Sequence, residues 1–289
     1  MKDKQASSTA LLVAASLSYL SRIRQSPPLV PSEARVLGDW LLQHSSTLSR
    51  AALAVLDQPW FQALIRTLEG LTVPHIIEHY ARRKKAIESL VREESHLHQL
   101  VVLGAGFDTL ALRLATDFYD LKAFEVDHPA TQAWKVKAVE ACGLGSPQLS
   151  FLPCDFSLSW PKNSDLLGLR YRKDERAMWV AEGFFMYFSS QQVQEFFRLI
   201  RSSSPSGSRV AFTFMEPQRD GRVDFRHASR SVHIWLAQRR EPLDWGIRQR
   251  DLPAFLSPLG FRLLDILPDV TQEVNRLNVG EYLALAELC

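Results

Sequence analysis

The chain has 289 residues, of which 46% are hydrophobic and 23% are charged, which is the composition of a globular protein with one large α/β domain or two small ones. Its 34 Lys and Arg residues nearly balance 32 Asp and Glu residues, and the formal charge of +2 gives no reason to expect a nucleic-acid partner. Cys142, Cys154 and Cys289 are too few and too far apart for a disulfide framework or a zinc site, which predicts no metal and favours a reducing, cytoplasmic compartment.

The start of the chain imitates a secretory leader but favours a helix. Lys2 and Lys4 precede an apolar run from Ala10 to Leu20, yet no Ala-x-Ala cleavage site follows it. The apolar residues continue at helical spacing as far as Ile23, and the run is too short to span a bilayer. The segment therefore predicts an amphipathic first helix, and no membrane partner is expected.

Two differently patterned parts meet near residue 97. Residues 1–97 show helical periodicity broken by prolines, which predicts an N-terminal helical cap or lid. Residues 98–289 alternate short β-rich runs with helical patterns, as in a sheet wound with crossover helices. The expected helices of the cap are 8–24, 32–47, 50–68 and 74–94.

The second part predicts an α/β fold with a seven-stranded, mostly parallel sheet and helices on both faces. The expected strands are Gln99–Leu103, Leu121–Val126, Leu149–Pro153, Ala177–Ala181, Arg209–Phe214, Phe261–Leu267 and Tyr282–Glu287. Helices are expected between them at 109–117, 129–142, 190–203, 224–239 and 249–257.

A glycine-containing turn follows the first expected strand. Leu100–Leu103 is a continuous apolar run, typical of a strand buried on both faces, and helical spacing resumes at Thr109. Gly104 and Gly106 therefore lie in a strand-to-helix turn, where glycine lets a ligand approach the main chain closely. A Gly-x-Gly pair gains its meaning only from this context.

Asp108 distinguishes two classes of cofactor that use such a turn. A dinucleotide-binding turn usually has a third glycine where this chain has Thr109, and it holds a pyrophosphate at the helix N-terminus. Asp108 would repel that anion by about 1 kcal/mol. S-adenosylmethionine carries a sulfonium and an ammonium group and no phosphate, so it suits the turn better. Simple capping of the helix by Asp108, worth ~1 kcal/mol, remains an alternative.

Three further acids follow expected strands, at the edge where open α/β sheets bind ligands. Asp127 ends the second strand 23 residues after the first glycine, the spacing of a carboxylate that accepts both hydroxyls of an adenosine ribose. Glu125 points to the same side and is an alternative, as is plain capping of the next helix. Asp155 and Glu182 follow the third and fourth strands. These acids predict an anionic rim that fits a positively charged adenosyl ligand. The rim consists of Asp108, Asp127, Asp155 and Glu182.

Four segments, in this order and spacing, resemble class I S-adenosylmethionine-dependent methyltransferases of the leucine carboxyl methyltransferase-like branch, which includes polyketide carboxyl O-methyltransferases. The segments are VVLGAGFDTLALRLA, FEVDHPATQAWK, CDFSLSW and WVAEGFFMYFS. Weaker similarity reaches SSTALLVAA with Arg24 and Pro28-Leu29 at the start, and GFRLLDIL and GEYLALAE at the end. The resemblance implies a Rossmann-like class I methyltransferase fold and S-adenosylmethionine as the cofactor.

The resemblance also implies roles for individual residues. The family has an arginine on the helix before the first strand that meets the cofactor carboxylate, and of Arg82 and Arg83 we favour Arg83, with a solvated helix face as the alternative. The chain departs from the family at Leu110, where arginine is usual, and at residues 30–32, where acids are usual. The other implied contacts are Gly104 and Gly106 to the methionine portion, Asp127 to the ribose, Asp155 and Phe156 to the adenine, and Glu182 near the methionine amino end.

The implied reaction is methyl transfer to oxygen, for which alignment and exclusion of water are the main requirements. A carboxylate acceptor is ionised near neutral pH and needs no general base. A hydroxyl acceptor needs one, and Tyr187, His227 and His233 are the candidates, although each is more typical of a structural role. We therefore expect an O-methyltransferase acting on a carboxylate, or a hydroxyl, of a small molecule or a peptide terminus.

The acceptor pocket is expected between the helical cap and an insert at about residues 217–253, where Phe225, Trp235 and Trp245 offer apolar surface. Two other functions stay open. The departures at Leu110 and residues 30–32 are compatible with a non-catalytic adenosyl-binding or scaffold protein. An NAD-dependent oxidoreductase is a further alternative, disfavoured by the missing third glycine and by Asp108.

Overall fold

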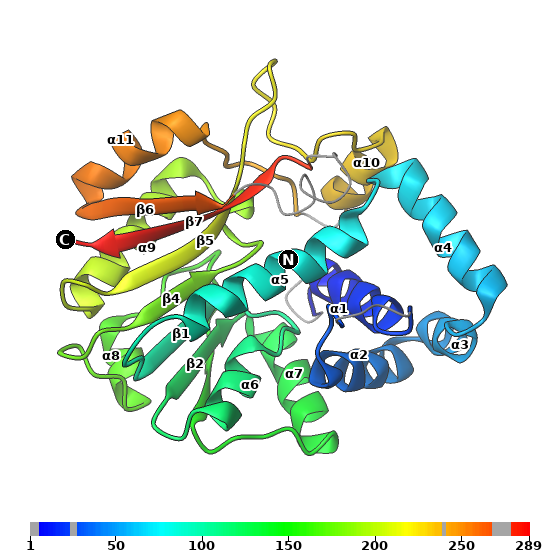
Figure 1. The fold of residues 1–289 in the computed structure, drawn as a ribbon, viewed down its shortest axis with the longest axis horizontal. Helices are drawn as coiled ribbons and strands as arrows, with labels where there is room; N and C mark the ends of the chain where they lie inside the picture. The colour runs from blue at the N-terminus through cyan, green and yellow to red at the C-terminus, as the bar shows by residue number, and fades with distance from the viewer. Residues whose placement is uncertain (1–5, 24–27, 239–240, 268–278) are drawn as a thin grey trace.

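A seven-stranded sheet forms the centre of the structure, a computed structural model that describes residues 6–23, 28–238, 241–267 and 279–289 (Figure 1). The strands lie in the order β3-β2-β1-β4-β5-β7-β6. β7 is antiparallel to both of its neighbours, whereas the pairings among β1 to β5 are parallel. The predicted α/β class with a mostly parallel sheet is confirmed. The strands are β1 (Gln99–Leu103), β2 (Lys122–Asp127), β3 (Leu149–Pro153), β4 (Met178–Ala181), β5 (Arg209–Met215), β6 (Phe261–Leu267) and β7 (Glu281–Leu288).

Helices cover both faces of this sheet (Figure 1). Helices α5, α6 and α7 lie on one face, and α8, α9 and α11 lie on the other. The helices are α1 (Ser8–Leu20), α2 (Ser32–Ser45), α3 (Thr47–Val55), α4 (Pro59–Thr72), α5 (Ile76–Arg92), α6 (Leu110–Asp117), α7 (Pro129–Ala141), α8 (Asn163–Gly168), α9 (Ser190–Ser203), α10 (Arg230–Gln238) and α11 (Leu252–Leu256), with a short 3₁₀ turn η1 (Phe185–Tyr187).

The packing of β1 on both faces of the sheet explains the apolar run Leu100–Leu103 in its sequence. Val101 and Leu103 pack against the α9 side of the sheet, whereas Leu100 and Val102 pack against α5 and α6. None of the four is more than 3% exposed. The strand is therefore covered on both faces, and its end is held rigidly where the glycine turn begins.

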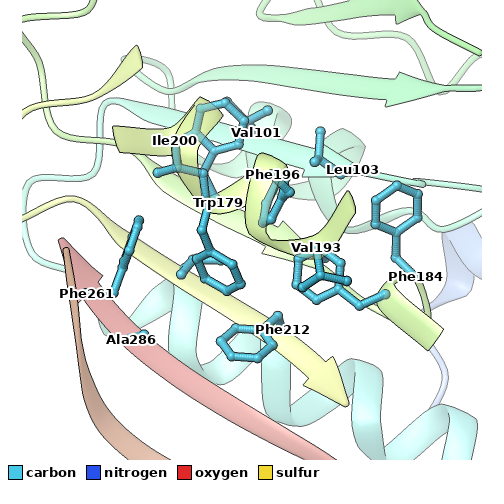
Figure 2. Packing of buried hydrophobic residues seen from close by; sticks show 14 of the residues in the cluster. Val101, Leu103, Trp179, Phe184, Val193, Phe196, Ile200, Phe212, Phe261 and Ala286 are labelled. Atoms are coloured by element: carbon cyan, nitrogen blue, oxygen red, sulfur yellow. The ribbon is translucent and has the colours of Figure 1, made fainter. Parts of the chain in front are cut away.

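Aromatic rings fill the α9 side of the core (Figure 2). Trp179 on β4, Phe196 on α9 and Phe212 on β5 are fully buried. The rings of Trp179 and Phe196 meet edge to face at 6.3 Å, a favourable arrangement for aromatic pairs. Truncating such a ring to alanine costs about 3–5 kcal/mol, so this cluster fixes β4 and β5 relative to each other.

Two expected helices differ substantially from the observed ones, and one observed helix has no expected counterpart. The single helix expected at 50–68 is wrong, because Pro59 lacks an N–H and instead begins α4 at its first turn. The helix expected at 224–239 is reduced to α10, because Arg226 N donates to Val279 O at 2.9 Å and His227 adopts a φ of 65°. α8 was not expected. Arg24, part of the weaker resemblance, lies outside the described residues.

Of the N-terminal helices, α5 packs onto the sheet, whereas α3 and α4 have no buried residue and lie away from it (Figure 1). α1 packs against α2 and α5, while Ile87 and Val91 of α5 join the cluster that contains Leu100. Within the described residues, no helix is long and apolar enough to cross a membrane.

Candidate functional site

A cavity of 680 Å³ lies at the carboxyl ends of β1, β2 and β4, between them and residues of α1, α5 and α10. Its volume is typical of a site for a small molecule. Arg82 lies on another face of α5 and does not line it; its guanidinium pairs with Glu78 at 2.7 Å. The structure therefore brings together residues that are up to 104 positions apart in the chain. The sequence-predicted residues that line the cavity are Arg83, Gly104, Gly106, Asp108, Asp127, Asp155, Phe156, Glu182 and Tyr187.

The glycine turn forms one wall of the cavity. Gly104 has a φ of 59° and Gly106 a φ of 50°, in the left-handed region that favours glycine. A Cβ at Gly104 would lie 2.2 Å from Cδ2 of Phe184, closer than two carbon atoms can approach. Both the backbone conformation and the neighbouring ring therefore require glycine at position 104.

Asp127 is fixed by the turn that it faces. Its carboxylate accepts hydrogen bonds from the backbone N–H groups of Gly106 and, at 2.6 Å, of His128. Burial raises the pKa of Asp127, and these hydrogen bonds partly offset the effect. The alternative, Glu125, is 1% exposed, does not line the cavity and pairs with Lys135 at 2.5 Å. Asp127 is thus the β2 carboxylate that faces the cavity.

Asp155 and Phe156 lie after β3, at the side of the cavity. Asp155 accepts from the backbone N–H and hydroxyl of Ser157, and the hydroxyl bond is the main cause of its lowered pKa. The ring of Phe156 meets Phe184 edge to face, with ring centres 4.9 Å apart. Together these residues place one carboxylate beside an aromatic wall.

Arg83 lies at the centre of a buried ionic network. Its Nε donates to Glu182 at 2.7 Å, and its Nη1 donates to Glu281 of β7. His79 Nε2 is 2.9 Å from the same Glu281 carboxylate. Burial alone would raise the pKa of Glu281, but Arg83 and His79 outweigh it and lower the pKa to about 2. Two acids therefore hold the Arg83 guanidinium at the cavity wall, with its carbon 5.3 Å from the centre of the Tyr80 ring.

Sequence reasoning predicted Glu182 but missed Glu281 and His79, the other members of this network. Glu281 is 1% exposed and is followed in β7 by the apolar run of residues 282–286. A buried acid next to such a run is unusual without a cationic partner. The acid next to an apolar run is visible in the segment GEYLALAE. Its cationic partner, Arg83, is not, because it lies 198 residues away in the chain.

Lys84, which was not predicted as a site residue, partly compensates the expected anionic rim. Its Nζ lies 2.6 Å from Glu182 and 3.1 Å from Asp108, so two of the four acids share its single positive charge. Burial would lower the pKa of Lys84, but the two carboxylates outweigh it and raise the pKa. The repulsion of a phosphate by Asp108 is correspondingly weaker than expected. Asp108 does not cap α6 either, since Thr109 is the N-cap residue.

The cavity nevertheless keeps a negative balance. Its described lining contains five carboxylates, from Asp108, Asp127, Asp155, Glu182 and Glu241, against the two cations Arg83 and Lys84. Glu241 was not predicted. It accepts hydrogen bonds from the hydroxyls of Ser7, at 3.2 Å, and Thr9, and so joins the start of α1 to the segment after α10.

The apolar part of the lining comes from the expected segments, with one exception. Phe225 and Trp235 line the cavity, but Trp245 does not and packs in the core, 5.9 Å from Phe185 and 5.6 Å from Phe255. Trp245 lies late in the insert, next to Gly246, which bridges to Met215 at the end of β5, and this brings its ring to the core.

Of the three candidate bases, the structure places only Tyr187 in the described cavity lining. Tyr187 lines the cavity, and burial raises its pKa. His227 is not part of the lining, and the side chain of His233 lies outside the described residues.

The departures from the family pattern lie away from the cavity. Leu110 is 3% exposed and packs with α5 and β1 in the core, and it does not line the cavity. Val30 packs in the cluster between α1 and α5. These changes therefore leave the described cavity lining intact.

Comparison with known proteins identifies the family. The family described as "Leucine carboxyl methyltransferase" matches residues 12–201, more than half of the chain. A protein of Mycobacteroides abscessus named "Putative S-adenosyl-L-methionine-dependent methyltransferase" is 27% identical over 283 residues, covering 91% of this chain and 84% of that protein. A protein of the same name from Mycolicibacterium smegmatis is 26% identical over 243 residues, covering 83% of this chain and 72% of that one.

Solved structures are similar in fold at low sequence identity. A DUF574 family protein from Streptomyces avermitilis has a TM-score of 0.59 at 14% identity, covering 99% of this chain and 98% of that chain. A protein from Thermobifida fusca has a TM-score of 0.58 at 13% identity, covering 99% and 96%. The chain belongs to the leucine carboxyl methyltransferase family and is an S-adenosylmethionine-dependent methyltransferase.

Proposed function

We propose that this methyltransferase acts on an oxygen of a carboxylate acceptor. The observation that carries the proposal is the set of proton-accepting candidates in the described cavity lining, two tyrosines and one histidine. Burial raises the pKa of Tyr80 to about 12 and raises that of Tyr187 further, so neither removes a proton near neutral pH. The histidine in the described lining, His128, accepts from Ala130 N at 3.2 Å and lies 3.5 Å from Asp155. An acceptor that is already ionised needs none of these groups as a base.

The cofactor roles of the lining are part of the same proposal. Asp127 retains free acceptor capacity on both oxygens, which suits two ribose hydroxyls. Phe156 and Asp155 offer an aromatic face and an acceptor to the adenine. Arg83 and Glu182 offer opposite charges to the carboxylate and the ammonium group.

The same lining suits the charge of the donor. When bound, S-adenosylmethionine supplies an activated methyl group on a positively charged sulfur. The negative balance of the lining stabilises such a cation in a cavity of low polarity. Gly104 and Gly106 keep the wall beside it free of side chains.

A labelled-methyl assay tests the acceptor chemistry. The protein is incubated with a metabolite extract and cofactor labelled in the methyl group, and the products are treated with mild alkali. Methyl esters release the label as methanol, whereas methyl ethers keep it, so we expect alkali-labile label. Alkali-stable label would place the transfer on hydroxyls. Tight S-adenosylhomocysteine binding with no transfer at all would favour the non-catalytic alternative.

We also propose that residues 1–97 act as the cap and residues 217–253 as the insert that together select the acceptor, around the domain of residues 98–289. Ser7, Thr9 and Glu241 support this division, because their hydrogen bonds link the two segments at the cavity. The three cysteines are free thiols, which supports a reducing, cytoplasmic compartment.

A further inference from the structure

We infer that a second copy of this chain binds to the outward side of α4, so that the protein forms a two-fold dimer through this helix. The inference goes beyond the proposed acceptor chemistry and does not depend on it. α4 lies at the edge of the molecule, away from the sheet (Figure 1). The surface concerned, which we call the α4 face, consists of the exposed residues Trp60, Ala63, Leu64, Thr67, Leu68, Gly70 and Leu71, none of which lines the cavity.

The α4 face is apolar. Spacings of four, four and three residues place four large side chains in one row along the helix. The Thr67 hydroxyl beside this row donates to Ala63 O at 2.9 Å and so leaves no unpaired hydrogen on the face. A contiguous apolar surface of this kind marks an interaction site. The exposed fractions in the row are 60% for Trp60, 45% for Leu64, 52% for Leu68 and 69% for Leu71.

The inward side of α4 is the more polar one. Glu69 accepts a hydrogen bond from the backbone N–H of Ile77 at 2.9 Å, and the Gln62 amide donates to Leu56 O at 3.3 Å. Ile65 packs on the same side, against the apolar cluster between α1 and α5. A helix on the surface of a monomer normally turns its polar side to water. The reversed arrangement is expected of a helix whose outward side is covered in the assembled protein.

Gly70 indicates that the covering partner approaches closely. Glycine weakens a helix relative to alanine, and the φ of Gly70 is not positive. Nothing in the described chain lies within 4 Å of a Cβ built at this position, so no contact within the chain requires glycine there. Together with Ala63 and Thr67, Gly70 forms a groove of small side chains beside the row of large ones. Such a groove admits the row of large side chains of another helix.

A second copy fits the α4 face because the face is complementary to itself. In a two-fold dimer the same surface lies on both sides of the interface, and the α4 face carries both the large row and the small groove. The four large side chains expose on the order of 500 Å², against about 800 Å² per partner in a standard interface. They can therefore form the apolar centre of such an interface, with neighbouring residues of α3 and α4 around it.

The charges of α4 disfavour a membrane as the occupant. Helices that bind membrane surfaces carry several Lys or Arg residues beside their apolar side. Arg66 is the one basic residue of α4. A vesicle surface would therefore gain little electrostatic attraction from this helix.

Light scattering after size-exclusion chromatography of the full-length protein tests the inference. Wild type is measured at loading concentrations from about 1 to about 100 µM, the range in which a micromolar dimer dissociates. We expect a mass of twice 32.8 kDa at the upper end and a fall toward 32.8 kDa on dilution. A mass of 32.8 kDa at every concentration would overturn the inference.

A matched pair of exposed leucines locates the interface. Leu68→Glu puts a charge into the row and should raise the Kd of the dimer at least tenfold. Leu167→Glu is the control, because Leu167 is 46% exposed on α8, far from α4 in Figure 1, and its dimer should match wild type. S-adenosylhomocysteine affinity, measured by calorimetry, should equal that of wild type in both variants and so verify their folding. A dimer that responds equally to both substitutions would contradict the assignment to α4.

Gly70→Leu separates close helix packing from unspecific adhesion. The substitution adds apolar surface but fills the groove, so it should weaken the dimer at least tenfold. Tighter self-association of Gly70→Leu than of wild type would contradict packing of a second helix at this position. Wild type that stays monomeric and sediments with vesicles of phosphatidylcholine and phosphatidylserine would show that a membrane covers the face, and would overturn the inference.

Discussion

Two carboxylates of β2 have the same chemistry and opposite environments. Asp127 faces the cavity, whereas Glu125, two residues earlier, is buried against Lys135 of α7. Strand alternation correctly put both on one side of the sheet. It did not say that α7 would cover the inner position, because that depends on where the helix packs. The choice between them therefore needed the structure.

Replacing Asp127 by alanine should lower the affinity for S-adenosylhomocysteine. The loss of charge-assisted hydrogen bonds to the ribose corresponds to about 1–3 kcal/mol, or roughly 5- to 150-fold in Kd. Titration calorimetry measures the change. Glu125→Gln is the matched control, and its affinity should stay within twofold of wild type. The reverse ranking of the two variants would move the ribose contact to Glu125.

Arg83 illustrates what the sequence conveys about a single residue and what it omits. The resemblance indicated an arginine in YARRKKAIE, and the helix phase of α5 turns Arg83 toward the cavity and Arg82 toward Glu78. The acids that hold it come from Glu182 and Glu281, in distant parts of the chain. Pairings of this kind follow from the tertiary fold, so local pattern does not reveal them.

At the scale of elements, the periodicity of the sequence predicted the sheet better than the helices. All seven strands were expected within about two residues of their observed ends, because each is a short β-prone run with turn residues on either side. The helix boundaries near Pro59 and before α10 were missed, since in one case a proline begins a new helix and in the other a strand-end carbonyl, Val279 O, takes the backbone N–H of Arg226.

The glycine turn is the element on which the cavity depends most. Gly104→Ala should destabilise the protein and weaken cofactor binding for two reasons. The new Cβ would clash with the Phe184 ring, and alanine disfavours the positive φ of this position. We expect a loss of about 1–3 kcal/mol, the usual cost of strain at such a position, visible in urea unfolding. Gly145→Ala is the control, since nothing lies within 4 Å of its Cβ and its φ is not positive. An equally small effect of both variants would show that the turn tolerates a side chain.

At the scale of the whole molecule, the ionic network joins the N-terminal helices to the end of the sheet. Arg83 of α5 meets Glu182 after β4 and Glu281 on β7, and His79 shares the latter. Removing one member of a buried pair typically costs about 3–5 kcal/mol, because the other charge remains buried. The network therefore couples stability to pH.

Glu281 should stabilise the protein at neutral pH and less so in acid. Its folded pKa of about 2 lies below the ordinary 4.5, so its contribution is present above about pH 4.5 and is lost as the pH falls toward 2. Wild type should exceed Glu281→Gln in free energy of unfolding at pH 7, and the difference should shrink as the pH is lowered below 4.5. Urea unfolding of both proteins measures it. A difference that stays constant, or grows in acid, would contradict the assigned pairing.

The pH dependence of methyl transfer tests most directly whether the cavity methylates an already ionised acceptor without a base. Single-turnover rates at saturating cofactor are measured from pH 6 to pH 9, with the acid that is methylated fastest. The predicted profile is flat, because the acceptor is a carboxylate throughout and the lining tyrosines stay protonated. A rate that rises tenfold per pH unit would mean that the reaction waits for a proton to leave, and would contradict the account.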